Sequence, residues 1–213
     1  MIARVDPASL PKFPDFSIEQ TLWKIGLTRL GGIDEAGRGA WAGPVSAGVV
    51  ILPPKLSVLK TLHGVRDSKQ MTVQQRESWV PLIQQTCLAW GVGFASAGEI
   101  DAIGILPATR LAALRALQNL SLTPEHLITD YLNLPEISIP QTPLIKGDRR
   151  SLSVAAASVL AKTSRDALMR QLENDFPAYG FACHKGYGTR RHQEAIRTHG
   201  LCIIHRKSFD IQK

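Results

Sequence analysis

The pattern of apolar and polar positions along the 213-residue chain predicts both strands and helices in its first half. Short apolar runs predict strands over Leu30–Asp34, Val45–Leu52 and Leu88–Ala97. Apolar residues at helical spacing predict helices over Thr72–Gln85 and Ala108–Leu120. A short glycine-rich turn joins the first two strands, so we expect them to form an antiparallel pair.

The second half alternates between short apolar runs and a long helical segment. Leu127–Tyr131 is expected to be a strand that ends at an acid, Asp130, and Leu144–Asp148 another extended stretch that ends at an acid. Leu152–Asn174 predicts a long helix whose first half consists largely of alanine and serine, which would let it lie close against a sheet. The order of these elements predicts a mixed α/β sheet with helices packed on it.

The start of the chain indicates a lead-in to a single domain. Three prolines within the first 16 residues predict irregular structure. Ser17, followed three positions later by Gln20, is typical of a capping box that opens a short helix through Ile25. We therefore divide the chain into a lead-in, residues 1–29, and one catalytic domain, residues 30–213, that includes a basic C-terminal region.

Composition narrows the class of protein. Hydrophobic residues make up 44% and charged residues 20%, so a packed core is expected and disorder is not. No apolar run reaches the roughly 18 residues that span a bilayer, and no secretory signal is evident. Three cysteines without regular spacing favour a reducing compartment, and we expect a cytoplasmic protein. A net charge of +7 favours a polyanionic partner.

Two adjacent acids, Asp34 and Glu35, close the first apolar strand, and a glycine turn that carries Arg38 follows. Neighbouring residues on a strand point to opposite faces, so both acids serve one site only if the chain turns at Glu35. Gly37 and Gly39 make such a turn easy. A solvated hairpin turn with acids at its edge is the alternative.

Two further acids favour a shared acidic site over a solvated hairpin turn. Asp130 and Asp148 each end a short apolar stretch, which is a usual place for site residues in α/β sheets. Asp148 also has a structural alternative, because it or Ser151 could cap the long helix. Together the four acids resemble the hard oxygen ligands of Mg²⁺ or Mn²⁺, and a bound cation would relieve their mutual repulsion.

The C-terminal region carries a second pattern. Basic residues in His184–His192 surround Tyr187, which stands between two glycines. Glycines let the backbone approach a ligand, and the ring could stack on a sugar or a base. The alternative is a solvated basic face. The histidines of this region lack paired zinc-ligand spacing, and we expect them beside phosphate or solvent.

With these blocks in this order, the sequence resembles ribonuclease HII, the bacterial type 2 ribonuclease H. The matching segments are Gly32–Val45, Asp67–Lys69, Asp130, Lys146–Asp148, Val154–Lys162 with Arg165 and Asp166, His184–His192 and His205–Phe209. The resemblance implies a ribonuclease H-like fold, with a mixed five-stranded sheet flanked by helices and a helical C-terminal portion.

The resemblance also implies roles for individual residues. The catalytic and metal-binding tetrad of the family falls on Asp34, Glu35, Asp130 and Asp148. The substrate-binding residues fall on Gly37, Arg38, Gly39, Lys69, Lys185 and Tyr187, of which the Gly-Arg-Gly turn reads a 2′-hydroxyl. One departure is that Tyr131 follows Asp130, where relatives often have glycine.

We accordingly expect an endonuclease that hydrolyses the RNA strand of RNA–DNA hybrids and cuts on the 5′ side of single ribonucleotides in duplex DNA. We expect a monomer that uses two divalent cations, Mg²⁺ or Mn²⁺, and leaves 5′-phosphate and 3′-OH ends. Its expected role is the excision of ribonucleotides during DNA replication and repair. Two alternatives are a catalytically dead binding module of the same fold and a related nuclease of DNA junctions. The four acids argue against the first, and the Gly-Arg-Gly turn with Tyr187 argues against the second.

Overall fold

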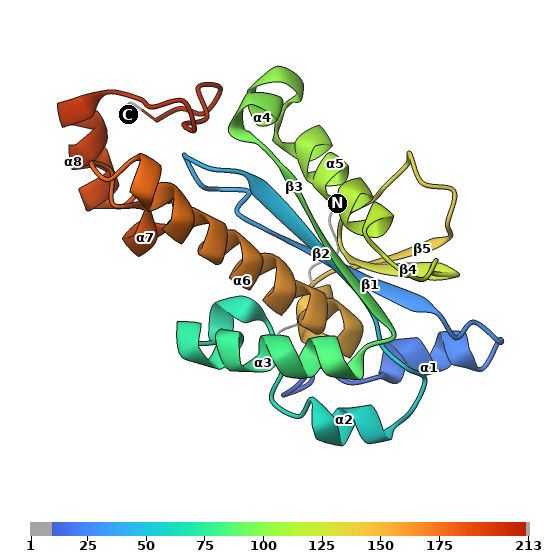
Figure 1. Ribbon diagram of the computed structural model, residues 1–213. Helices are drawn as coiled ribbons and strands as arrows, with labels where there is room; N and C mark the ends of the chain where they lie inside the picture. The colour runs from blue at the N-terminus through green and yellow to red at the C-terminus, as the bar shows by residue number, and fades with distance from the viewer. Residues whose placement is uncertain (1–9, 212–213) are drawn as a thin grey trace.

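The computed structural model describes residues 10–211 and contains one five-stranded sheet with helices on both faces (Figure 1). The strand order is β3-β2-β1-β4-β5. The strands are β1 (Leu30–Ala36), β2 (Val45–Ile51), β3 (Ala89–Ala95), β4 (His126–Asp130) and β5 (Gln141–Leu144). The expected ribonuclease H-like sheet is confirmed, and its central strand is the one that carries the two adjacent acids.

The pairing of β1 decides where the acids meet. β1 runs antiparallel to β2, as expected from the short turn, with Asp34 opposite Gly48. β1 runs parallel to β4, with Ile33 opposite Thr129. Parallel strands end at the same edge of a sheet, so Asp34 and Asp130 come to lie side by side.

The helices form two layers around the sheet. In Figure 1, α6 crosses one face of the sheet and α5 lies on the other. The helices are α1 (Ser17–Trp23), α2 (Ser57–Thr61), α3 (Val73–Thr86), α4 (Ala97–Ile103), α5 (Ile105–Gln118), α6 (Leu152–Asp175), α7 (Phe181–His184) and α8 (Arg190–His199). The last two confirm the helical C-terminal portion. Among residues 10–211, no helix has the length and apolarity needed to cross a bilayer.

The small residues of α6 let its backbone rest directly on the sheet, as the sequence indicated. A Cβ atom on Gly32 would lie 2.2 Å from the carbonyl carbon of Ser153, and one on Gly48 would lie 2.5 Å from the oxygen of Ala157. Both distances are too short for a side chain. Glycines on β1 and β2 therefore set the depth at which α6 packs beside the acids.

The first helix begins differently from the expectation. The predicted capping box between Ser17 and Gln20 does not form, because the N-cap residue is Phe16. Phe16 is fully buried, and its burial starts the helix one residue early, so that the N–H of Ser17 donates to the carboxylate of Asp15 instead. Capping boxes form at the starts of α3 and α4.

The predicted extended stretch Leu144–Asp148 is wrong beyond its first residue. β5 ends at Leu144, and the chain then reverses through Lys146, whose φ is 56°. A 3₁₀ turn, Gly147–Arg149, follows and carries Asp148. The N–H of Gly147 donates to the Asp130 carboxylate at 2.7 Å, which fixes this turn against the end of β4.

The described part of the lead-in packs into the core. Glu19 of α1 is buried and accepts hydrogen bonds from the hydroxyl of Ser151 and the N–H of Ser153. These bonds connect α1 to the start of α6. Residues 1–9 lie outside the described part of the chain, and the boundary between residues 29 and 30 stays a prediction.

Candidate active site

Three aspartates converge where β1 and β4 end. Asp130 ends β4, Asp34 lies beside it on β1 two residues before that strand ends, and Asp148 comes from the adjacent 3₁₀ turn. One carboxylate oxygen of each lies within 4.8 Å of those of the other two. Asp34, Asp130 and Asp148 lie far apart in the sequence. They form one cluster because β1 and β4 are parallel and the 3₁₀ turn folds back beside them.

Glu35 lies next to this cluster without joining it. A turn at Glu35 was the expected condition for both acids to serve one site, but β1 continues through Ala36 and the turn begins at Gly37, whose φ is 90°. The Glu35 carboxylate accepts a hydrogen bond from the Arg38 guanidinium at 2.9 Å. It nevertheless lines the same hollow as Asp130 and Asp148.

The capping alternative for Asp148 is resolved by the start of α6. The N-cap residue is Ser151, whose hydroxyl accepts from the N–H of Val154 at 3.2 Å. Asp148 has no capping role there. Its carboxylate is buried beside the other acids, which leaves it available to a ligand.

The four acids share an electrostatic environment that disfavours their charged forms. Burial raises the pKa of Asp34 well above its usual value, and the neighbouring charges of Glu35 and Asp130 raise it further. Burial and then Asp130 raise the pKa of Asp148 to about 7. Burial likewise raises the pKa values of Glu35 and Asp130. A cation among them would reverse these shifts.

The donor set fits a hard divalent cation. Within the described residues, one buried carboxylate oxygen of Asp34 and one of Glu35 have no hydrogen-bond partner. Buried carboxylate oxygens without donors are costly unless a cation binds them. Carboxylates are the ligands that Mg²⁺ and Mn²⁺ prefer, so the residues present suit such an ion.

The raised pKa of Asp148 predicts how stability depends on pH without metal. The folded state holds its proton up to about pH 7, whereas an unfolded aspartate releases it near pH 4. The stability from this group is therefore present below about pH 4 and lost as pH rises to about 7. In EDTA, the Tm of Asp148→Asn should rise relative to that of the wild type as pH rises through this window. The expected gain is about 2–4 °C for each kcal/mol of unfolding free energy that the wild type loses. A Tm difference that does not change between pH 4 and pH 8 would contradict the prediction.

A second hollow, of about 540 Å³, adjoins the acids and gathers most of the predicted substrate-binding residues. Gly37, Arg38, Gly39, Lys69 and Tyr187 all line it, together with Glu35. These residues come from the turn after β1, the 3₁₀ turn at Ser68–Gln70, and the loop before α8.

Lys185, also predicted to bind substrate, is placed differently. Its ammonium turns back to donate to the carbonyl of Ala182. Burial lowers its pKa. Lys185 contributes to the region through its backbone carbonyl, which accepts from Arg165 at 3.0 Å.

Lys69 stands between the acids and this hollow. Burial by itself lowers the pKa of Lys69, but the negative charges of Asp34 and Asp67 outweigh burial and raise it. Asp67 caps the 3₁₀ turn by accepting from the N–H of Lys69 at 2.9 Å. The ammonium is therefore held charged beside the acids.

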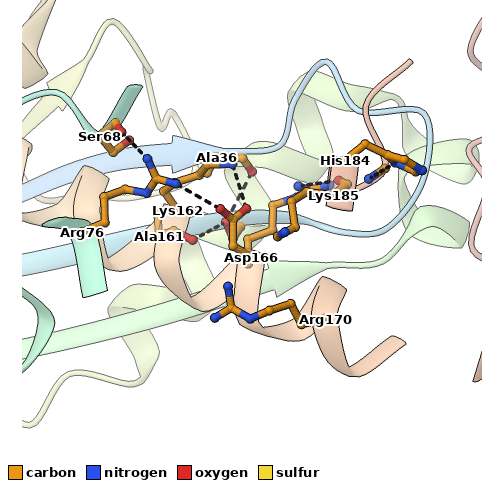
Figure 2. Close-up of polar contacts among 12 residues, drawn as sticks. Ala36, Ser68, Arg76, Ala161, Lys162, Asp166, Arg170, His184 and Lys185 are labelled. Atoms are coloured by element: carbon orange, nitrogen blue, oxygen red, sulfur yellow. Dashed lines mark hydrogen bonds and ion pairs between the residues drawn. The ribbon is translucent and has the colours of Figure 1, made fainter. Parts of the chain in front are cut away.

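Lys162 of α6 is a lining residue that the sequence did not single out. Figure 2 shows its ammonium and the guanidinium of Arg76 directed at the carboxylate of Asp166. The two distances to Asp166 are 2.7 Å from Lys162 and 3.4 Å from Arg76. The ammonium of Lys162 also lies 5.4 Å from the centre of the Tyr187 ring. The signal in the sequence was a charged run that interrupts a helix of small residues.

Ser158 also has a larger role than expected. The sequence suggested only a small residue at a tight contact, but its hydroxyl donates to that of Ser68 at 2.9 Å. Ser158 also lowers the pKa of Asp34, against the larger effect of burial. Ser158 thus connects the Lys69 turn to the acid cluster.

The histidines of the C-terminal region were expected beside phosphate or solvent, and that expectation is wrong for three of them. His184, His192 and His205 are buried. The rings of His192 and His205 meet through their Nε2 atoms at 3.1 Å, and Nδ1 of His192 lies 3.0 Å from the carbonyl oxygen of Tyr187. Burial lowers the pKa of His192 to about 4, so it is neutral and donates to that carbonyl.

Tyr131, the departure noted beside Asp130, lies in an unusual backbone conformation. Its φ is 54°, in the left-handed region that glycine favours. The side chain is exposed and lines the hollow that contains Asp130 and Asp148. Tyr131 therefore occupies a backbone conformation in which glycine would be free of strain.

The fold and the buried acids define a nuclease of the ribonuclease H-like class, and comparison with known proteins identifies the family. The ribonuclease HII family model matches residues 31–212. The ribonuclease HII of Chloroflexus aurantiacus is 52% identical over 197 residues, which cover 92% of this chain and 93% of the relative. The chain belongs to the ribonuclease HII family. It is an endoribonuclease that degrades the RNA of RNA–DNA hybrids.

Solved structures agree on the fold. Ribonuclease H2 from Pyrococcus horikoshii aligns with a TM-score of 0.71 at 24% identity, covering 86% of this chain and 94% of that one. A ribonuclease HIII described in complex with Mn²⁺, Bst-RNase HIII, aligns with a TM-score of 0.66 at 19% identity, covering 89% and 69%.

Proposed function

We propose that the enzyme cuts on the 5′ side of a single ribonucleotide in duplex DNA as well as within RNA–DNA hybrids. The observation that carries this proposal is the position of the Gly37–Gly39 turn, which lines one hollow together with Glu35 and Tyr187. A turn that can approach a sugar closely, next to the acids, is suited to sensing the 2′-hydroxyl, which alone distinguishes RNA from DNA at one nucleotide.

Hydrolysis is proposed to depend on Asp34, Glu35, Asp130 and Asp148 as ligands of two divalent cations. When bound, such cations would supply a water of lowered pKa as the nucleophile and would stabilise the departing 3′ oxygen, so that the products carry 5′-phosphate and 3′-OH ends. The clustered, partly unpartnered carboxylates support this proposal. So does the Mn²⁺ complex of Bst-RNase HIII, whose fold is similar.

The chain's own groups are proposed to orient the duplex. Lys69 and Lys162 offer ammonium groups to phosphates at the hollow, and Tyr187 packs against a sugar. All of these groups and the four acids belong to one chain, which supports action as a monomer. The free cysteines Cys87, Cys183 and Cys202 support a reducing cytoplasmic location.

Three matched duplexes test the proposal: all-DNA, DNA with one ribonucleotide, and an RNA–DNA hybrid, each incubated with Mg²⁺ or Mn²⁺. We expect cleavage of the second and third, with the second cut once on the 5′ side of the ribonucleotide. An enzyme that cuts the hybrid but ignores the single ribonucleotide would refute the proposed junction activity. Cleavage of all-DNA would remove the role of the 2′-hydroxyl.

A further inference from the structure

Two fully buried arginines lie directly behind the loops that face the hollow. Arg165 belongs to α6, and Arg206 belongs to the segment after α8. Within residues 10–211, neither guanidinium forms an ion pair with a carboxylate. Their donors go to backbone carbonyls instead. A buried charge is costly unless it is fully hydrogen-bonded, so these carbonyls are held firmly.

Arg206 binds the Gly-Arg-Gly turn from behind. Its guanidinium donates to the carbonyl oxygen of Gly37 at 2.7 Å and to that of Arg38 at 2.8 Å. A third bond reaches the carbonyl of Gly43 at 3.0 Å, and the guanidinium lies 5.1 Å from the centre of the Phe209 ring. One planar group therefore fixes two successive peptide planes of the turn.

Fixing these carbonyls also fixes the amides opposite them. In a trans peptide the C=O and the N–H point in opposite directions, and the described residues contain no cis peptide. The N–H groups of Arg38 and Gly39 therefore point away from Arg206. Both residues belong to the turn that lines the hollow. Neither N–H donates to another atom of residues 10–211. They form a pair of adjacent free donors, an arrangement that binds oxygen acceptors.

Arg165 ties the tyrosine loop to the same turn. It donates to the carbonyl of Lys185 at 3.0 Å, and its guanidinium carbon lies 5.4 Å from the centre of the Tyr187 ring. A Cβ atom on Gly37 would lie 2.0 Å from Nε of Arg165, so the turn rests directly on this side chain. The two loops that line the hollow are thus fixed to each other through one guanidinium.

We propose that Arg206 is a positioning residue that presents the N–H groups of Arg38 and Gly39 to the 2′-oxygen of a ribonucleotide, with Arg165 fixing Tyr187 beside it. This inference rests on the proposed reading of the 2′-hydroxyl and adds the side chain that makes the turn competent for it. Lysine cannot replace Arg206, because an ammonium does not present a planar fork to two carbonyls.

Cleavage kinetics provide the first test. Arg206→Lys should lower kcat/KM for the single-ribonucleotide duplex about 10²-fold, because a misplacement of about 1 Å has that effect on a reacting group. The affinity for all-DNA duplex should stay unchanged, since phosphate contacts remain. The matched control is Arg110→Lys, which removes a bond to the carbonyl of Asn133 outside the hollow. A folded Arg206→Lys enzyme with unchanged kcat/KM on every duplex would overturn the proposal.

Amide hydrogen exchange in the wild-type protein provides a test that does not depend on a variant that folds. In EDTA, which prevents cleavage, the duplex with one ribonucleotide should slow exchange at Arg38 and Gly39 more than the all-DNA duplex does. Equal exchange with both duplexes would overturn the proposal. If the wild type cuts hybrids but ignores single ribonucleotides, the proposed junction activity is refuted. The role of Arg206 is then tested on hybrids, where Arg206→Lys must still impair cleavage.

Discussion

Asp34→Asn is expected to lower cleavage of an RNA–DNA hybrid by about 10³-fold or more while the protein stays folded. Under the proposed mechanism, cations bound by the acids would contribute several kcal/mol of transition-state stabilisation, and each 1.36 kcal/mol is worth a factor of ten in rate. Asp34 is the most buried of the clustered acids and has an oxygen without a partner within the described residues, so among the proposed ligands it is the one that water can least replace.

The same substitution should not destabilise the metal-free protein. Burial and the charges of Glu35 and Asp130 raise the pKa of Asp34, so the folded protein disfavours the charged carboxylate, and a neutral amide removes that repulsion. Cleavage rates, Tm in EDTA and Mn²⁺ affinity by calorimetry measure the three consequences. Glu77→Gln, which changes a surface carboxylate paired with Arg170, is the control and should leave all three unchanged. Near-wild-type cleavage by Asp34→Asn would contradict the proposal that Asp34 is a metal ligand.

The acids could be found from the sequence because their positions depend on local rules. Asp34 and Asp130 end short apolar runs, and runs of that kind become parallel neighbours in an α/β sheet. Asp148 was identified by its position in a motif, but the 3₁₀ turn that carries it was not predicted. The reversal at Lys146 depends on the bond from Gly147 to Asp130, a contact between two elements that no single window of sequence contains.

The buried charged and aromatic groups behind the site were beyond prediction for a related reason. Arginine is almost never fully buried, so nothing in the sequence marked Arg206 as a core residue, and His192 was expected beside phosphate or solvent. Arg206 is buried because it bonds to Gly37, 169 positions earlier in the chain. Such distant pairs become visible only when the fold brings the two segments together.

Tyr187→Ala is expected to lower kcat/KM for the single-ribonucleotide duplex about 5- to 150-fold, with a smaller loss on a long hybrid. Stacking of an aromatic ring on a nucleotide contributes about 1–3 kcal/mol, which corresponds to that range. The ring is held in place for such a contact. Lys162 and Arg165 lie 5.4 Å from its centre, and the backbone carbonyl of Tyr187 is bonded to His192.

The larger effect on the single ribonucleotide follows from the number of contacts that each substrate offers. A hybrid presents a ribose at every position of one strand, so a shifted register still places a 2′-hydroxyl at the Gly37–Gly39 turn. Duplex DNA with one ribonucleotide has a single productive register, which the Tyr187 ring is proposed to select. Tyr187→Phe keeps the ring and its contacts with Lys162 and Arg165, so it should retain most of the activity on both substrates. Losses of equal size on the two duplexes would show that Tyr187 contributes general affinity and does not sense the ribonucleotide.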